Sequence, residues 1–104
     1  MGEDVIRYFK TIFLEQVRSF FKSIDKKAVR KILYNVDLAE QINDPRLFKK
    51  LNDNIWEFRT KYGNLQYRLL AFWDKSDKQN TLVAATHGII TAEDIRRLYF
   101  QDQD

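Results

Sequence analysis

The chain has 104 residues, a formal net charge of +3 and no cysteine. This length suits one domain over residues 1–104 with a single hydrophobic core, and 44% hydrophobic residues with only three Gly and one Pro argue against a disordered chain. Without cysteine there is no disulfide or thiolate metal site, and without an apolar run of ~18 residues or a signal-like leader we expect a cytoplasmic protein with no membrane partner.

The N-terminal half predicts one strand and then two helices. Residues 4–10 are rich in β-branched and aromatic side chains and predict the strand, and Thr11 is a candidate N-cap for a helix over residues 12–24. Asp25 is expected to cap a second helix over residues 26–42. The apolar stripes, spaced by three and four, are Ile12, Phe13, Val17, Phe20, Phe21 and Ile24 in the first helix and Val29, Ile32, Leu33, Val36, Ala39 and Ile42 in the second. Neither helix can bury its stripe alone, so both should pack on a sheet.

The C-terminal half predicts strands. Asn43-Asp44-Pro45 ends the second helix, residues 47–51 lead into a strand, and residues 52–54 form a turn. A hairpin over residues 54–73 comes next, then a polar loop over 74–80, a last strand over 81–90 and a short helix over 92–100. The order β-α-α-β-β-β-α predicts the α+β class, with a small antiparallel sheet and the N-terminal helical hairpin packed on one side.

The hairpin over residues 54–73 has two chemically different faces. It turns at Tyr62-Gly63-Asn64, where Gly63 and Asn64 tolerate positive φ. Because side chains alternate along a strand, one face of the first strand carries Trp56, Phe58, Thr60 and Tyr62, and the other carries Ile55, Glu57, Arg59 and Lys61. In the second strand the two sets are Tyr67, Leu69, Ala71 and Trp73, and Gln66, Arg68, Leu70 and Phe72. We assign Trp56, Phe58 and Trp73 to the core, which leaves a cationic face behind it.

Positive charge is concentrated around this hairpin. Between Arg46 and Arg68 there are six cationic residues and two acidic ones, so the window carries +4 and the remainder of the chain −1. The six are Arg46, Lys49, Lys50, Arg59, Lys61 and Arg68. A local excess of this kind is what binding to a polyanion requires. The alternative is a solvated strand face on which Lys and Arg protect the sheet from aggregation.

Four segments together resemble a known family: N-D-P-R-L-F-K-K-L at 43–51, W-E-F-R-T-K-Y at 56–62, Q-Y-R at 66–68 and H-G-I-I at 87–90. They resemble the phage-derived, HigB-like branch of the RelE/HigB toxin superfamily, the toxic halves of bacterial type II toxin–antitoxin pairs. In that family a Lys- and Thr-rich loop follows H-G-[FI]-[IV], whereas here Ile90 is followed at once by Thr91. Either the chain lacks the loop, or the sequence as read omits residues after Ile90. We favour the second explanation, because Ala92 onward resembles the family's final helix.

The resemblance implies cleavage of messenger RNA, commonly on the ribosome, without a metal or another cofactor. The ribose 2′-hydroxyl attacks the adjacent phosphorus, which requires a base, an acid and positive charge at the phosphoryl oxygens. We predict that Arg59 and Arg68 supply the charge and that His87, a residue type suited to proton transfer at physiological pH, transfers a proton. The predicted RNA-binding residues are Lys49, Lys50, Lys61, Tyr62 and Tyr67.

Each of these roles has a structural alternative. Arg59 could form an ion pair with Glu57, His87 could be a hydrogen-bonded residue at a strand end, and Tyr62 and Tyr67 could belong to the core. The partners implied by the resemblance are messenger RNA, the ribosome and a cognate antitoxin with a helix-turn-helix. Two other functions stay open: a non-catalytic toxin that binds protein, as gyrase inhibitors of the ParE branch do, and an inactive remnant that binds RNA or an antitoxin.

Overall fold

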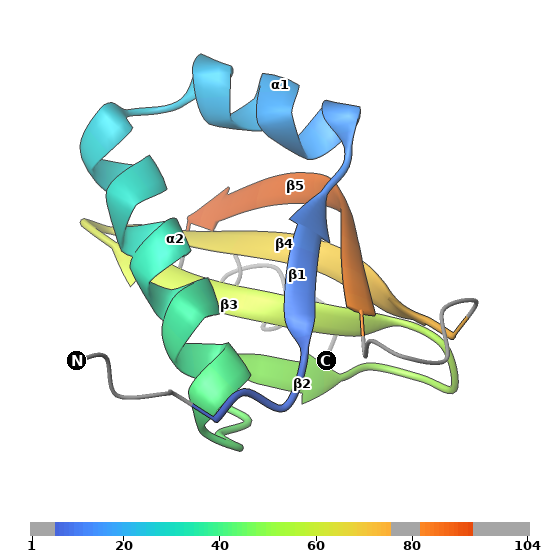
Figure 1. Ribbon diagram of the computed structural model, residues 1–104. Coiled ribbons are helices and arrows are strands. Elements are labelled where there is room, and N and C mark those ends of the chain that lie inside the picture. Colours follow the sequence, from blue (N-terminus) through green and yellow to red (C-terminus); the bar gives the residue numbers. More distant parts are fainter. Residues whose placement is uncertain (1–5, 76–81, 93–104) are drawn as a thin grey trace, which may run out of the picture.

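A five-stranded sheet carries both helices on one face (Figure 1). The computed structural model describes residues 6–75 and 82–92. The elements in chain order are β1 (Lys10–Phe13), α1 (Glu15–Ser23), α2 (Lys26–Gln41), β2 (Phe48–Lys50), β3 (Trp56–Tyr62), β4 (Leu65–Asp74) and β5 (Leu82–Ala92). The predicted α+β class with a helical hairpin on one side of the sheet is confirmed.

The strands lie in the order β1-β5-β4-β3-β2. Neighbours from β2 to β5 pair antiparallel, but β1 pairs parallel with β5, so the sheet is mixed rather than antiparallel throughout. The two helices carry the chain from β1 to the far edge of the sheet, and the four remaining strands then run back toward β1. Four strands follow the helices instead of the three in the expected order, because residues 48–50 pair with β3 as a strand of their own.

The first strand begins later than predicted, at Lys10 instead of residue 4, and residues 4 and 5 lie outside the described part of the chain. Thr11 is therefore a strand residue, not an N-cap, and its N–H donates to Glu40 Oε2 at 2.8 Å. Leu14 is the N-cap of α1 and makes no side-chain capping bond. The helical spacing was misleading here because Ile12 and Phe13 lie in the strand that pairs with β5, and Phe13 packs against the core from that strand.

The boundary between the helices is as predicted. Asp25 caps α2, and its Oδ1 accepts the N–H of Lys27 at 2.8 Å. Within the α2 stripe Ile32, Val36 and Ala39 are buried. Leu33 and Ile42 are each 41% exposed, so the prediction was wrong for these two members of the stripe, and Ala28 and Glu40 are buried in addition.

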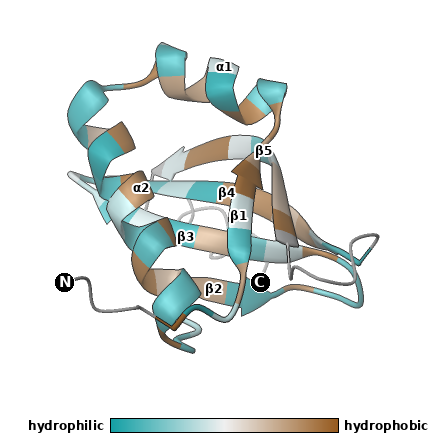
Figure 2. Ribbon diagram, viewed as in Figure 1, coloured by the Kyte–Doolittle hydropathy of each residue, from teal (hydrophilic) through white to brown (hydrophobic). Residues whose placement is uncertain are grey.

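The core lies between the helices and the covered face of the sheet, where Figure 2 shows hydrophobic segments on the strands. Its largest fully buried side chains come from α1, α2, β4 and β5: Val17, Ile32, Leu69 and Val83. An aromatic cluster fills the end near β2, where the ring centroid of Phe48 is 4.3 Å from Phe58 and 4.8 Å from Trp56. Trp73 meets Trp56 edge-on at 5.7 Å, so the assignment of these aromatics to the core is confirmed.

Strand β5 settles the question of the loop after Ile90. Its backbone continues without a break through Thr91 to Ala92, two residues beyond the predicted end, and pairs with β4 along the way. The expectation that residues had been omitted there was wrong; the chain has no loop at that point. The predicted loop residues 76–80 and the predicted helix from residue 93 onward lie outside the described residues. Neither α1 nor α2 is long and apolar enough to cross a bilayer.

Candidate functional site

Arg59 and Arg68 project from the face of the sheet that α1 and α2 do not cover, here called the outer face. They are register partners on β3 and β4, and partners in an antiparallel pair share a face. Thr60, the next residue of β3, points the other way and bonds to α2. The arginine side chains are 28% and 17% exposed. Like charges directly opposite each other destabilise a sheet, so this arrangement requires a nearby negative charge.

Glu57 supplies that charge from a position two residues before Arg59. Its carboxylate oxygens lie 3.4 Å from Arg59 Nε and 3.5 Å from Arg68 Nη1, and its side chain is only 5% exposed. The anticipated Arg59–Glu57 ion pair is thus confirmed, but both separations exceed the ~2.7–2.9 Å of a strong charge-assisted bond. The Nε atoms of both arginines are buried and make no hydrogen bond to any residue that the structure describes. Glu57 therefore leaves part of the donor capacity of both guanidinium groups unsatisfied.

His87 lies on the same outer face. Lys49, Glu57, Leu70 and His87 are successive register partners across β2, β3, β4 and β5. The imidazole is exposed, and its Nδ1 lies 3.0 Å from Thr86 Oγ1. Because the Thr86 hydroxyl donates its only proton to the Leu70 carbonyl at 3.2 Å, it accepts from His87 Nδ1–H. This tautomer leaves Nε2 as the basic nitrogen of the ring.

Gly88 fixes the strand segment that carries His87. A Cβ atom at position 88 would overlap the side-chain ring of Phe20, which reaches β5 from α1. Only a residue without a side chain allows this close approach of the helix to the strand. The H-G pair of the sequence thus combines an exposed imidazole with a packing requirement on the opposite face.

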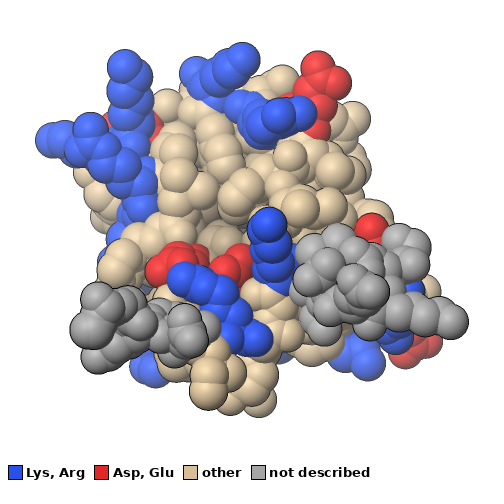
Figure 3. All heavy atoms as spheres, viewed as in Figure 1, with Lys and Arg blue, Asp and Glu red and all other residues tan. Residues whose placement is uncertain are grey.

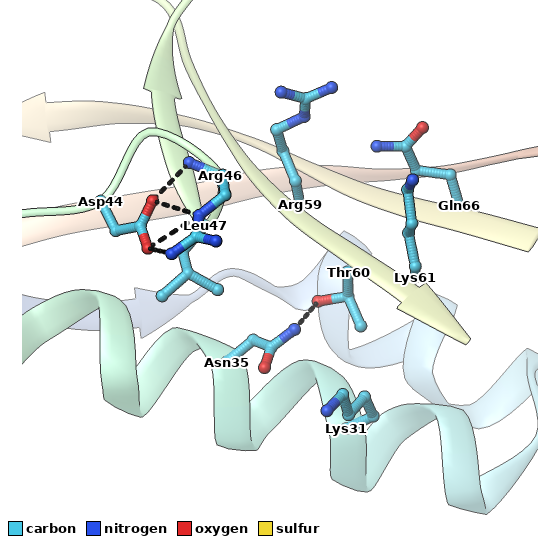
Figure 4. A pocket seen from close by; sticks show the side chains of 9 residues that line it. All are labelled: Lys31, Asn35, Asp44, Arg46, Leu47, Arg59, Thr60, Lys61 and Gln66. Atoms are coloured by element: carbon cyan, nitrogen blue, oxygen red, sulfur yellow. Dashed lines mark hydrogen bonds and ion pairs between the residues drawn. The ribbon is translucent and has the colours of Figure 1, made fainter.

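A cavity of about 550 Å³ opens beside Arg59 at the edge of β3; it is here called the edge cavity (Figure 4). Strand β2 pairs with β3 only from Trp56 to Phe58, so the second half of β3 borders the cavity instead of another strand. Its lining residues come from α2, the turn before β2, β3 and β4: Lys31, Asn35, Asp44, Arg46, Leu47, Arg59, Thr60, Lys61 and Gln66. Four of them are cationic and one is acidic, so the cavity suits an anionic ligand or one rich in hydrogen-bond acceptors.

Two hydrogen-bonded pairs shape the edge cavity. Asp44 accepts from Arg46 Nε at 3.1 Å and from Nη2 at 2.8 Å, and these bonds lower the pKa of the Asp44 carboxyl and raise that of the Arg46 guanidinium. Across the cavity, Asn35 Nδ2 donates to Thr60 Oγ1 at 3.2 Å. Figure 4 shows Asn35 reaching from α2 to Thr60 on β3, whereas the side chain of Lys31 lies along the helix.

The structure brings together five of the eight residues predicted from the sequence. Arg59, Arg68, His87, Lys49 and Lys61 share the outer face.

The other three predicted residues do not belong to this cluster. Lys50 is exposed but pairs with Trp56, so its side chain points to the opposite side of the sheet. Tyr62 packs against the core, and Tyr67 is 4% exposed within it. Burial raises the pKa of the Tyr67 hydroxyl, with the charges of Asp25 and Tyr62 adding to the effect. Both tyrosines thus have the core position that the sequence left open.

Sequence reasoning missed two groups of residues. The first is the α2 and turn side of the edge cavity, with Lys31 and Asn35 one helical turn apart on α2. The second is a basic helical surface: residues 16–36 hold six cationic residues and one acid, Asp25. Figure 3 shows Lys and Arg side chains projecting around the helical layer. The six are Arg18, Lys22, Lys26, Lys27, Arg30 and Lys31, and a charge count over this window would have revealed them.

Comparison with known proteins gives one match. The family model described as "Phage derived protein Gp49-like (DUF891)" matches residues 19–88, roughly two thirds of the chain. The matched span begins in α1 and ends in β5, and it includes Arg59, Arg68 and His87. No curated protein and no solved structure matched the chain.

Proposed function

Because the chain belongs to the family of phage-derived, Gp49-like proteins, we propose that it is an endoribonuclease toxin related to the RelE/HigB superfamily. One observation carries the proposal: Arg59, Arg68 and His87 occupy neighbouring positions on one face of a rigid sheet. Two guanidinium groups and an imidazole can supply the positive charge and the proton transfer that phosphodiester cleavage by a 2′-hydroxyl requires. The proposed substrate is messenger RNA, bound in an extended form across the outer face.

In this mechanism the two arginines hold the scissile phosphate. Their partly exposed guanidinium groups donate N–H bonds to the non-bridging oxygens, whose negative charge grows as the phosphorus becomes five-coordinate. The sheet fixes both side chains before the substrate arrives, so little reorganisation is needed during the reaction. Glu57 keeps the pair together in the free protein, at separations long enough for the phosphate to compete with it.

His87 acts as the base. Its Nε2 takes the proton of the 2′-hydroxyl while Thr86 holds the opposite ring nitrogen. The new bond joins the 2′-oxygen to phosphorus, the bond to the 5′-oxygen breaks, and this leaving oxygen takes a proton from water. The products are a 2′,3′-cyclic phosphate and a 5′-hydroxyl end.

The basic helical surface supports a second nucleic-acid contact. It lies on the opposite side of the molecule from the outer face, so one RNA could bind each side. A protein that cuts messenger RNA on the ribosome needs two such surfaces, and here ribosomal RNA would contact the helices while messenger RNA binds the outer face. We further propose a cognate antitoxin with a helix-turn-helix, which co-purification from the native operon would identify.

The position of Glu57 favours one competing function. A buried carboxylate shared by both arginines is also what a purely structural ion-pair network contains. The competing function is an inactive remnant that binds RNA or an antitoxin without cutting.

A cleavage assay separates these functions. Purified protein is incubated with a defined messenger RNA, with and without ribosomes, and the fragment ends are mapped. Cyclic-phosphate ends produced by the wild type and lost in Arg68→Ala support the toxin function. Intact RNA under both conditions, with harmless overexpression, supports the remnant. Intact RNA with inhibited DNA supercoiling would instead indicate a protein-binding toxin.

A further inference from the structure

We infer that the edge cavity is a base-recognition site that selects a purine next to the cleaved phosphate, with Asn35 as the residue that reads it. This inference rests on the proposed function only for the position of the phosphate. It assigns a specificity role to α2, which carries none of the residues of the proposed reaction.

Size and position both suit a nucleotide base. The volume of about 550 Å³ falls within the range of ~300–1,000 Å³ that is typical of small-molecule sites. Arg59 lines the cavity and also stands opposite Arg68 on the outer face. An RNA strand whose phosphate contacts Arg59 therefore places an adjoining nucleotide at the mouth of the cavity.

The amide of Asn35 has the right groups to read a purine. One of its N–H groups donates to Thr60 Oγ1, which fixes the plane of the amide. The second N–H and the Oδ1 acceptor make no hydrogen bond within residues 6–75 and 82–92. An Asn amide pairs in this way with the N7 and N6 atoms of adenine. Lys31, also in the cavity, is a donor that suits the N7 and O6 atoms of guanine.

The ring acceptor N7 is the feature that both purines share and that pyrimidines lack. Because Asn35 and Lys31 offer mainly hydrogen-bond donors, we expect discrimination between purines and pyrimidines rather than between the two purines.

The walls of the cavity provide flat and apolar contacts for the ring. Bonds to Asp44 hold the planar guanidinium of Arg46 in place at the mouth, where its side chain is 88% exposed. Bases stack on guanidinium planes of this kind. Leu47 adds an apolar contact beside it.

Binding of short synthetic RNAs tests the inference without requiring cleavage. The RNA carries a 2′-deoxyribose at the attacking position so that it cannot be cut, and its affinity is measured by fluorescence anisotropy. All four bases are compared at each position flanking the scissile phosphate. At one of these positions we expect purines to bind about tenfold more tightly than pyrimidines, and 7-deazapurines, which lack N7, to lose the advantage.

Two variants connect this preference to Asn35. Asn35→Ala should bind purine and pyrimidine RNAs equally, while Thr60→Val, which removes the acceptor that orients the amide, should weaken the preference. Asn43→Ala is the matched control, since Asn43 lies beyond the end of α2 and outside the edge cavity. Circular dichroism shows that each variant is folded.

The inference is overturned if the wild type binds all four bases equally, if 7-deazapurines bind as well as purines, or if Asn35→Ala retains the preference. These results leave the proposed function intact when unmodified RNA is still cut. Conversely, a purine preference that depends on Asn35 in a protein that never cuts RNA would support the base site and reject the endoribonuclease.

Discussion

Arg59 and Arg68 stand directly opposite each other on β3 and β4, and each contacts a different oxygen of one buried carboxylate. Two like charges in this position are tolerated because Glu57 lies between them. The arrangement holds two guanidinium groups in place for an anion. Binding of a substrate phosphate to them then depends on how easily it displaces the Glu57 carboxylate.

Removing Arg68 or His87 from the proposed reaction centre should strongly slow cutting. Arg68→Ala and His87→Ala are each expected to reduce the cleavage rate by about 10²-fold or more, because each removes a group that acts on the transition state. The measurement is single-turnover cleavage of a short RNA. Lys10→Ala removes a positive charge from β1, the edge strand opposite β2, and this variant should cut RNA like the wild type. Equal rates in all four proteins would reject the assigned roles.

Replacing Glu57 should destabilise the fold. In Glu57→Gln the two arginines face each other without a buried counter-charge, and we expect a loss of about 3 kcal/mol in the free energy of unfolding. Urea denaturation measures the change. The double variant Glu57→Gln/Arg59→Gln should recover part of the loss because it removes one of the two opposed charges. Glu15→Gln, at the exposed start of α1, is the control.

Adding one methyl group at position 88 should disturb the packing of α1 on β5. Gly88→Ala is expected to lower the free energy of unfolding by about 1–3 kcal/mol, because its Cβ would overlap the ring of Phe20. Replacing Phe20 by the smaller Leu in the double variant Gly88→Ala/Phe20→Leu should recover part of the lost stability. If the single variant is as stable as the wild type in urea, the close approach of helix and strand is not a constraint.

Alkaline pH should unfold the protein partly through Tyr67. Burial raises the pKa of this hydroxyl above its usual value of 10.0, so the folded chain keeps a proton that the unfolded chain releases. This contribution to stability is complete below about pH 10 and is lost as the pH rises further. Between about pH 9 and pH 11 we therefore expect Tyr67→Phe to lose less stability than the wild type in urea. Tyr34→Phe, altered at a position that is 61% exposed, should behave as the wild type.

The sequence was most informative where structure follows a local rule. Alternation along residues 56–73 correctly separated core from outer face, and the turn at Gly63 placed Arg59 opposite Arg68. Only Gly63 adopts positive φ there, at 62°, and Asn64 does not. Local spacing failed at Ile12 and Phe13, which satisfy a helical pattern but lie in a strand, because the pattern cannot show which surface buries a residue.

The rest of the site depends on contacts between distant segments. The edge cavity exists because β2 begins only at Phe48, opposite Phe58, and α2 passes beside the remaining part of β3, and no short stretch of sequence shows either fact. The same holds for the parallel pairing of β1 with β5, since strand propensity does not specify a partner. Asn35 could be recognised as a candidate only after the helix had been placed beside the strand.

The pairing of β1 with β5 also bears on how the protein is made. The first strand has no neighbouring strand until β5, which begins at Leu82, has left the ribosome, and α1 packs largely on the same late strand. Closing so long a loop is entropically costly and slow compared with forming the β3–β4 hairpin. A nascent chain interrupted before Leu82 would therefore lack both His87 and the surface that holds its first helix, so the finished sheet and the complete reaction centre can appear only after β5 has been synthesised.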